Sequence, residues 1–211
     1  MMYSLSEIDA HCKKATRGAG FSWGHAEEAG KAARYLAAVQ LPGAALLAQY
    51  LPEYSKNALH FQAPSLRTDA SVSDVTLCPI QTAACLCDEA ELLGEHPLVL
   101  GKVAYPLLLL PALQMIAANK GLLLDVSWDG VRLVCDQTGV MALGQANLDT
   151  PLASEVVVRV LNGEEVTGRV KAAGVLGQDI DEKYWGTLAD LAHKTYVPAT
   201  EESRKGAGPA D

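Results

Sequence analysis

The stretch LLLDVSWDGVRLVC, Leu122–Cys135, decides the fold because two segments rich in apolar residues flank a central Asp129-Gly130 pair. An Asp-Gly pair is typical of the type I′ turn, whose two positive φ angles match the twist of paired strands. The stretch therefore predicts a β-hairpin with strands at Leu122–Trp128 and Val131–Cys135.

On the N-terminal side of this hairpin, the segment Tyr105–Asn119 is apolar on every side, as expected for a helix enclosed by other elements. Pro106 suits the first position of such a helix, whereas Pro111 would kink it by removing one backbone hydrogen bond. The alternative is a strand that runs through Leu110, followed by a helix that starts at Pro111. We expect the sheet to pack against this apolar helix.

On the C-terminal side, Val140–Leu143 and Glu155–Leu161 extend the pattern to a third and a fourth antiparallel strand. A last helix is expected to begin near Asp181, because four apolar residues fall on one face. These residues are Tyr184, Trp185, Leu188 and Leu191. Shorter elements are expected before the hairpin, namely strands at Ala58–Phe61, Asp74–Leu77 and Val99–Lys102 and a helix at Thr82–Leu93.

The first 51 residues predict three short helices joined by tight turns. Ser4 and Glu7 have the spacing of a capping box, in which each side chain satisfies a free backbone N–H of the other residue. Gly18 lies where a left-handed residue commonly ends a helix. The expected helices are Leu5–Arg17, Trp23–Ala38 with Ser22 as its cap, and a third that Pro42 begins and that ends near Leu51.

Taken together, these elements predict an α+β fold in a single domain, residues 1–211. Residues 1–51 form a helical N-terminal subdomain, and residues 52–195 form an α+β body with a small antiparallel sheet, an apolar helix and a C-terminal helix. Residues 196–211 form a polar tail rich in glycine and proline.

Composition excludes several classes of protein. The chain has 211 residues, of which 49% are hydrophobic and 20% charged, which is too apolar for a disordered chain. Its net charge of −8 argues against a nucleic-acid-binding protein, which needs a basic surface. The most apolar window, Val103–Ala118, would span about 24 Å as a helix, short of the roughly 30 Å of a membrane core. No secretory signal is visible, so the expected location is the cytoplasm.

The cysteines predict neither disulfides nor a metal site. Their number, five, is odd, and Cys85 and Cys87 are separated by one residue, with Cys78 seven residues before Cys85. Structural zinc sites commonly use two pairs of ligands with two to four intervening residues, and no second pair is present. We therefore expect these thiols to be small buried apolar groups rather than metal ligands or a nucleophile, and we expect no cofactor.

A candidate ligand site combines the N-terminal turn with the C-terminal tail. Glycines precede the helix expected at Trp23–Ala38, so the turn is either an anion cradle or a tight helix–helix connection. That helix places Glu27 and Lys31 at i,i+4 spacing, which suits an exposed ion pair or a charged ligand. The expected ligand-binding residues are Arg17, Trp23, Glu27, Lys31, Tyr196, Ser203 and Arg204.

Residues 17–38, RGAGFSWGHAEEAGKAARYLAA, resemble the start of an uncharacterised bacterial family of unknown function. The segments YPLLLLPAL at 105–113, Val126–Trp128 and TYVPATEESRKGAG in the tail are similar to later parts of that family. The resemblance implies a bacterial source but no catalytic residue or cofactor. It also implies that the tail is more than a loose end. The residues that carry most of it are Arg17, Gly18, Gly20, Trp23, Gly24, Glu27, Glu28 and Gly30.

With no phosphate loop, catalytic triad or metal motif in the sequence, we expect a non-catalytic protein that binds a small acidic metabolite or serves as an accessory subunit. The alternatives are a hydrolase or lyase acting on a small metabolite at the same residues, and a structural or assembly protein. The apolar composition also predicts a homodimer or a complex with another enzyme, although a well-buried core explains the same composition.

Overall fold

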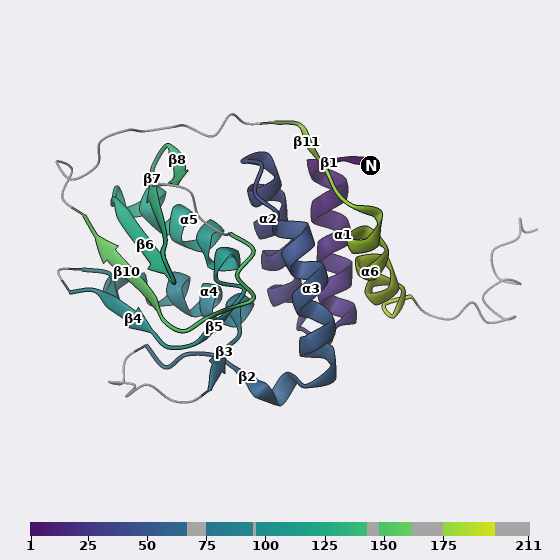
Figure 1. Cartoon of the computed structure of the whole chain (residues 1–211), viewed down its shortest axis with the longest axis horizontal. Helices are drawn as coiled ribbons and strands as arrows, with labels where there is room; N and C mark the ends of the chain where they lie inside the picture. Colours follow the sequence, from purple (N-terminus) through teal and green to yellow (C-terminus); the bar gives the residue numbers. More distant parts are fainter. Residues whose placement is uncertain (67–74, 95, 143–147, 162–174, 197–211) are drawn as a thin grey trace, which may run out of the picture.

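The computed structural model describes residues 1–66, 75–94, 96–142, 148–161 and 175–196. Figure 1 shows a group of helices from both ends of the chain beside a part that contains the main sheet and further helices. This combination of helices and mainly antiparallel sheets confirms the α+β fold predicted from the sequence.

The helical group joins the two ends of the described chain, because the C-terminal helix packs against the N-terminal helices. Contacts are most extensive between α1 and α2, and α6 packs on both α1 and α3. The predicted capping box is present, since the Ser4 backbone N–H donates to Glu7 Oε2 at 2.9 Å and the Glu7 N–H donates to Ser4 Oγ. The four helices are α1 (Leu5–Gly18), α2 (Trp23–Ala38), α3 (Gly43–Lys56) and α6 (Glu182–His193).

The expectation that Gly18 takes a left-handed conformation after the first helix was wrong. Gly18 is the last residue of α1, and the positive φ of 112° belongs to Gly20. Gly18 is required for another reason: a Cβ at this position would collide with the backbone carbonyl of Leu191 in α6. The glycine therefore permits close contact between two helix backbones.

The third helix is longer than predicted. Pro42 is the residue before α3 rather than its first residue, and the helix continues through Pro52 to Lys56. A proline inside a helix removes one backbone hydrogen bond. Packing beyond it offsets that loss, because the Tyr54 ring stacks on Phe21 with 3.9 Å between ring centroids.

The main sheet has five strands in the order β4-β10-β6-β7-β8, all antiparallel. The predicted hairpin is confirmed: Trp128 pairs with Val131, and Asp129 and Gly130 have φ angles of 37° and 85°. The strands are β4 (Leu98–Leu100), β6 (Leu124–Trp128), β7 (Val131–Asp136), β8 (Gly139–Ala142) and β10 (Val156–Val160).

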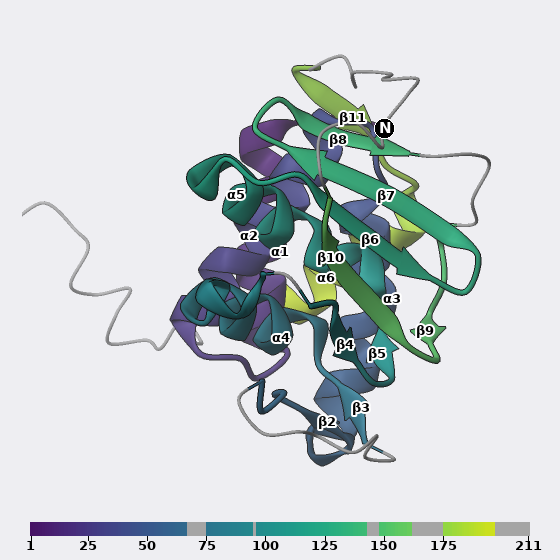
Figure 2. The same cartoon turned by 90° about the vertical axis from the view of Figure 1, so that its left-hand side faces the viewer.

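The predicted fourth strand, β10, does not pair with the predicted third strand, β8. β10 pairs with β6 on the opposite side of the hairpin from β8, and β4 lies beyond β10. Sequence order alone does not specify this, because a strand can add to either edge of a hairpin. Helix α5 (Leu110–Lys120) packs on one face of the sheet, against β6 and β7, and Figure 2 shows the sheet from its other side with the helices behind it.

Two smaller sheets complete the described structure. One has the order β2-β3-β5-β9 and includes parallel pairs. The other pairs β1 (Met2–Ser4) with β11 (Gly177–Asp179), the strand before α6, and was not predicted. The strands of the first are β2 (Phe61–Gln62), β3 (Thr76–Leu77), β5 (Val103–Ala104) and β9 (Leu152–Ala153).

Several short elements differ from their predicted bounds. The strand expected at Ala58–Phe61 is a 3₁₀ turn over Ala58–His60 followed by β2. Asp74, expected to begin a strand, lies outside the described residues. The helix expected at Thr82–Leu93 is α4 (Pro79–Asp88) followed by a 3₁₀ turn, and it begins earlier because the Cys78 thiol caps its first turn by accepting from the Gln81 N–H.

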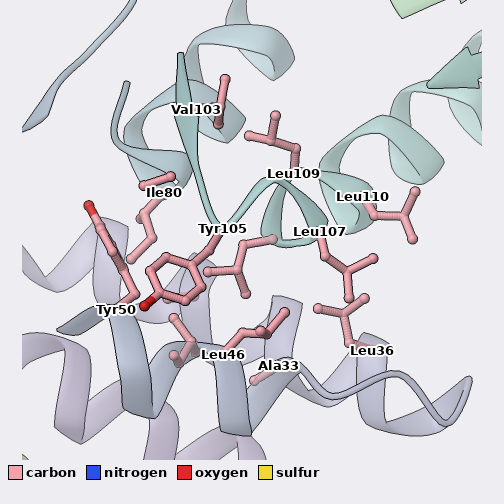
Figure 3. Close-up of a cluster of buried hydrophobic side chains, with 14 of the residues drawn as sticks. Ala33, Leu36, Leu46, Tyr50, Ile80, Val103, Tyr105, Leu107, Leu109 and Leu110 are labelled. Atoms are coloured by element: carbon pink, nitrogen blue, oxygen red, sulfur yellow. The ribbon is translucent and has the colours of Figure 1, made fainter. Parts of the chain in front are cut away.

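The apolar segment after Tyr105 is helical throughout, so the strand alternative was wrong. A 3₁₀ turn, η3 (Pro106–Leu109), leads into α5, and Pro111 lies in the first turn of α5, where its missing N–H costs no helical hydrogen bond. A single helix kinked at Pro111 was therefore also wrong. Figure 3 shows Tyr105 with Leu107 and Leu109 of η3 in the core that joins α2 and α3 to this segment.

Candidate functional site

A cavity of about 640 Å³ lies between α2, α3, α4, η3 and α5. Its walls exist because the facing helices carry small side chains that do not fill the space between them. Ala32 of α2, Ala83 and Ala84 of α4 and Ala112 of α5 are all half-buried and line it. The cavity is therefore a product of tertiary packing among helices from different parts of the sequence.

The floor of the cavity is apolar. Ala29, Leu47, Ile80 and Leu108 line it and are all buried. These residues belong to the main core, so the floor is held rigidly by the packing around it. A ligand with an apolar body would gain about 25 cal/mol for each Å² of apolar surface that leaves water here.

The rim of the cavity carries charge. The Lys31 ammonium donates to Glu28 Oε1 at 2.8 Å, and this hydrogen bond, together with the carboxylate charge, raises the pKa of Lys31. Asp88, the last residue of α4, is exposed and also lines the cavity. Met115, which is 42% exposed, adds a flexible apolar side chain.

The Cys87 thiol in the cavity wall stays protonated near neutral pH. Burial raises the pKa of the Cys87 thiol to about 11, and the Glu28 and Asp88 carboxylates contribute to the rise. Since the thiolate is the reactive species, Cys87 is a weak nucleophile near neutral pH. Burial also raises the pKa of Cys78, whose sulfur accepts a hydrogen bond from the Tyr50 hydroxyl at 3.0 Å.

Two polar side chains lie on the side of the cavity nearest the sheet. The Tyr35 hydroxyl is buried and has no hydrogen-bond partner among the residues that the structure describes, and burial raises its pKa. Gln114 Nε2 donates to the Asp136 carbonyl at 3.5 Å. Both residues line the cavity, so the Tyr35 hydroxyl and the Gln114 amide would lie close to a molecule bound there.

Of the residues predicted to bind a ligand, Lys31 lines the cavity. Arg17, Trp23, Glu27 and Tyr196 lie elsewhere, and the remaining two lie outside the described residues. The predicted pair of Glu27 with Lys31 is not formed: Glu27 pairs with Lys13 of α1 at 3.4 Å, while Lys31 pairs with Glu28. The α1–α2 contact places Lys13 within reach of Glu27, which the spacing within one helix cannot reveal.

Arg17 and Trp23 lie together at the turn between α1 and α2. Arg17 Nη1 donates to the Phe21 carbonyl at 2.7 Å, and the guanidinium lies 5.5 Å from the centroid of the Trp23 ring. The Trp23 side chain is 54% exposed. The guanidinium thus fixes the turn.

Tyr196, the last described residue, lies near Lys14 of α1. The Lys14 ammonium lies 5.6 Å from the centroid of the Tyr196 ring, and His193 packs edge-on against the same ring. Tyr196, the first residue of the expected tail, therefore lies beside α1. Ser203 and Arg204, the other predicted ligands, lie outside the described residues.

The sequence did not indicate the cavity itself. Tyr35, Cys87, Gln114 and Met115 carry no local motif, and alanines in amphipathic helices are common. Within the ranges given above, no group of three or more histidine, cysteine or acidic residues is placed to hold a metal ion. No helix in the described part of the chain is long and apolar enough to cross a membrane.

Residues 3–85 match the family model described as "Protein of unknown function (DUF3726)". The match confirms the resemblance to a family of unknown function for the N-terminal part of the chain. It includes α1, α2, α3 and the first seven residues of α4, and hence most of the α2, α3 and α4 sides of the cavity, but not α5. No curated protein and no solved structure matches the chain.

Proposed function

We propose that this protein is a non-catalytic binding protein that holds a small, largely apolar molecule in the cavity between α2, α4 and α5. The observation that carries the proposal is the combination of a buried apolar floor with a charged rim in a hollow of about 640 Å³. Small-molecule sites have volumes of about 300–1,000 Å³ and a mostly apolar lining with a few polar groups.

The chemistry of the lining supports binding over catalysis. A hydrolase or lyase needs a nucleophile or a base whose pKa is near the working pH. The Cys87 thiol has its pKa raised to about 11, and the Lys31 ammonium has its pKa raised by Glu28. Both groups therefore keep their protons near pH 7 and are poor at removing one from a substrate.

Binding is tested with N-phenyl-1-naphthylamine, a neutral apolar dye whose fluorescence rises when it leaves water. The wild-type protein should bind it at one site per chain. Ala112→Phe places a ring in the cavity and should abolish binding, whereas Ala10→Phe adds the same ring at an exposed position of α1 and should not. Equal binding by the wild type and Ala112→Phe would place the dye elsewhere and contradict the proposal.

The natural ligand is sought by native mass spectrometry of the purified protein. A retained molecule should raise the mass of the wild type and of Ala10→Phe, and should be missing from Ala112→Phe. A molecule retained equally by all three proteins would not occupy the cavity.

A second candidate is the acid-binding site at the turn between α1 and α2. It is favoured by the Arg17 guanidinium beside Trp23 and by the Lys14 ammonium beside Tyr196. A guanidinium binds a carboxylate or phosphate through two parallel hydrogen bonds. Any small acid found by the mass-spectrometric screen should lose its binding in Arg204→Ala with little change in thermal stability, and retention of binding would exclude the tail from the site.

The expected homodimer, or complex with another enzyme, is a separate proposal. It is supported by exposed apolar side chains such as Val99 on the edge strand β4. Light scattering should give the mass of a dimer, and a clean monomer at high concentration with no partner in a native pull-down would contradict it. The cytoplasmic location remains a prediction of the sequence.

A further inference from the structure

We propose that the molecule bound in the cavity carries a positively charged group, an amine or a quaternary ammonium, which lies at the rim between Glu28 and Asp88. This inference rests on the proposed function, because it names the chemistry of the ligand for the same cavity. It differs from the small acid expected from the sequence, whose site would lie at Arg17 rather than in the cavity.

The charges of the rim leave a net negative site. Three charged residues line the cavity: Glu28, Lys31 and Asp88. The Lys31 ammonium is occupied by Glu28 at 2.8 Å. Asp88 makes no such pair among the described residues, so its carboxylate is left to interact with a cation from outside the chain.

The end of α4 adds to the negative potential at the same place. A helix carries the equivalent of about half a negative charge at its C-terminus, which is commonly balanced by lysine or arginine in the last turn. The last turn of α4 has no basic residue and ends in an acidic one, Asp88. A bound cation would occupy the place that a basic side chain takes in other helices.

The pKa of the Cys87 thiol, in the cavity wall, is affected by the same negative potential. Besides burial, the carboxylates that raise its pKa are Glu28 on α2 and Asp88 on α4. Both carboxylates therefore act on one point of the cavity wall from opposite helices. An ammonium group near that point would be attracted by both, and a carboxylate would be repelled by both.

The apolar lining determines the rest of the ligand. A molecule with its charge at the rim would place its body over Ile80 and Leu108, which are buried, and beside Met115, whose flexible side chain adapts to different shapes. Desolvation of the charge is small because Asp88 and Lys31 are exposed to water. An amine with an aromatic or aliphatic body fits both parts.

The experiment measures displacement of the naphthylamine dye by matched molecules. The probes are 2-phenylethylamine, 2-phenylethanol and 3-phenylpropionate, together with an octyl chain bearing the same three end groups, at pH 7 and low ionic strength. For the better of the two bodies, the amine should bind about tenfold more tightly than the alcohol, and the carboxylate should bind more weakly than the alcohol. The preference for the amine should shrink in high salt.

Charge variants identify the groups responsible. Asp88→Asn should bring the affinities of amine and alcohol close together, and Lys31→Gln should widen the difference between them. Asp190→Asn removes the same charge from an exposed position on α6 and should change nothing. The affinity for the alcohol is the internal control, since a folded variant keeps it.

The outcomes separate the two proposals. If the dye and the alcohols bind in the cavity but the amines bind no better than the alcohols, or the ratio is the same in Asp88→Asn, the ligand is not a cation and the binding function stands. If neither amine displaces the dye, the inference is also overturned. If the dye itself fails to bind, the proposed function is overturned with it.

Discussion

Two helix contacts in this molecule are built from small residues, and they have opposite outcomes. Where α1 meets α6 and α2, Gly18 and Gly30 let the chains approach until an added Cβ would meet the Leu191 carbonyl in one case and Asp9 in the other. Where α2 meets α4 and α5, alanines leave a cavity of about 640 Å³. Small side chains thus permit either close contact between two helices or a cavity, and the relative positions of the helices determine which of the two forms.

The largest effect is expected from Gly18→Ala in the closed contact. The new methyl group would collide with the Leu191 backbone carbonyl, so α1 and α6 must separate. We expect a loss of about 3 kcal/mol in the free energy of unfolding, measured by urea denaturation. Gly186→Ala is the matched control. Among the described residues, no atom outside the α6 backbone lies within 4 Å of the Cβ position at Gly186, so this change should stabilise the helix by about 0.5–1 kcal/mol. A neutral Gly18→Ala would show that the contact is looser than described.

The next effect is expected beside the cavity, from Tyr35→Phe. The Tyr35 hydroxyl is buried without a described hydrogen-bond partner, and such a group costs about 1–3 kcal/mol. Removing it should raise the free energy of unfolding by about 1 kcal/mol in the absence of ligand. Destabilisation would reveal that the hydroxyl has a partner.

A smaller effect on stability is expected from Ala112→Phe, in contrast to Gly18→Ala. One added methyl group should be costly in the closed contact, but a whole ring in the open one should change the free energy of unfolding by no more than about 1 kcal/mol. Urea denaturation of both variants compares the two contacts directly. A loss similar to that of Gly18→Ala would indicate that the cavity is too small or too rigid to accept a ring.

The smallest effect on the free energy of unfolding is expected from a change of pH, at the contact between α1 and α6. The His11 ring stacks on Trp185 at 4.0 Å, and its Nε2–H donates to the Trp185 carbonyl at 3.2 Å. Burial lowers the pKa of His11, and the Lys14 ammonium lowers it further, although the hydrogen bond opposes the change.

The folded state therefore resists protonation of His11 more than the unfolded state does. Its contribution to stability is complete above the unfolded pKa of about 6.5 and is lost as pH falls through the folded value. His11→Phe keeps a stacked ring without a titrating group. The wild type should lose stability relative to His11→Phe between pH 7 and pH 5, and a constant difference would contradict the account.

Local signals in the sequence predicted most of the elements. The Ser4–Glu7 capping box, the Ser22 cap and the Asp129-Gly130 turn each depend on residues within a few positions, and all three are present. The apolar face of α6 is likewise confirmed, with Leu188 and Leu191 buried.

Features that depend on distant contacts were not predictable in the same way. Gly18 has the local signature of a helix end, but its role is set by Leu191, far along the chain. The β1–β11 pair joins residues far apart in the sequence, and neither segment has a strand pattern. For the same reason the sequence offered Lys31 as a candidate ligand-binding residue but did not indicate the cavity that Lys31 lines, because that cavity forms only when α2, α4 and α5 come together.

The most direct test of ligand binding in the cavity is methyl NMR of the protein during titration with the naphthylamine dye. Ile80 and Met115 lie in the lining of the cavity, whereas Ile8 is buried in α1 and Met2 is exposed in β1. The account predicts shifts of the Ile80 and Met115 methyl signals that saturate together, with the Ile8 and Met2 signals unchanged. Unchanged Ile80 and Met115 signals during binding, or shifts confined to Met2 or Ile8, would contradict it.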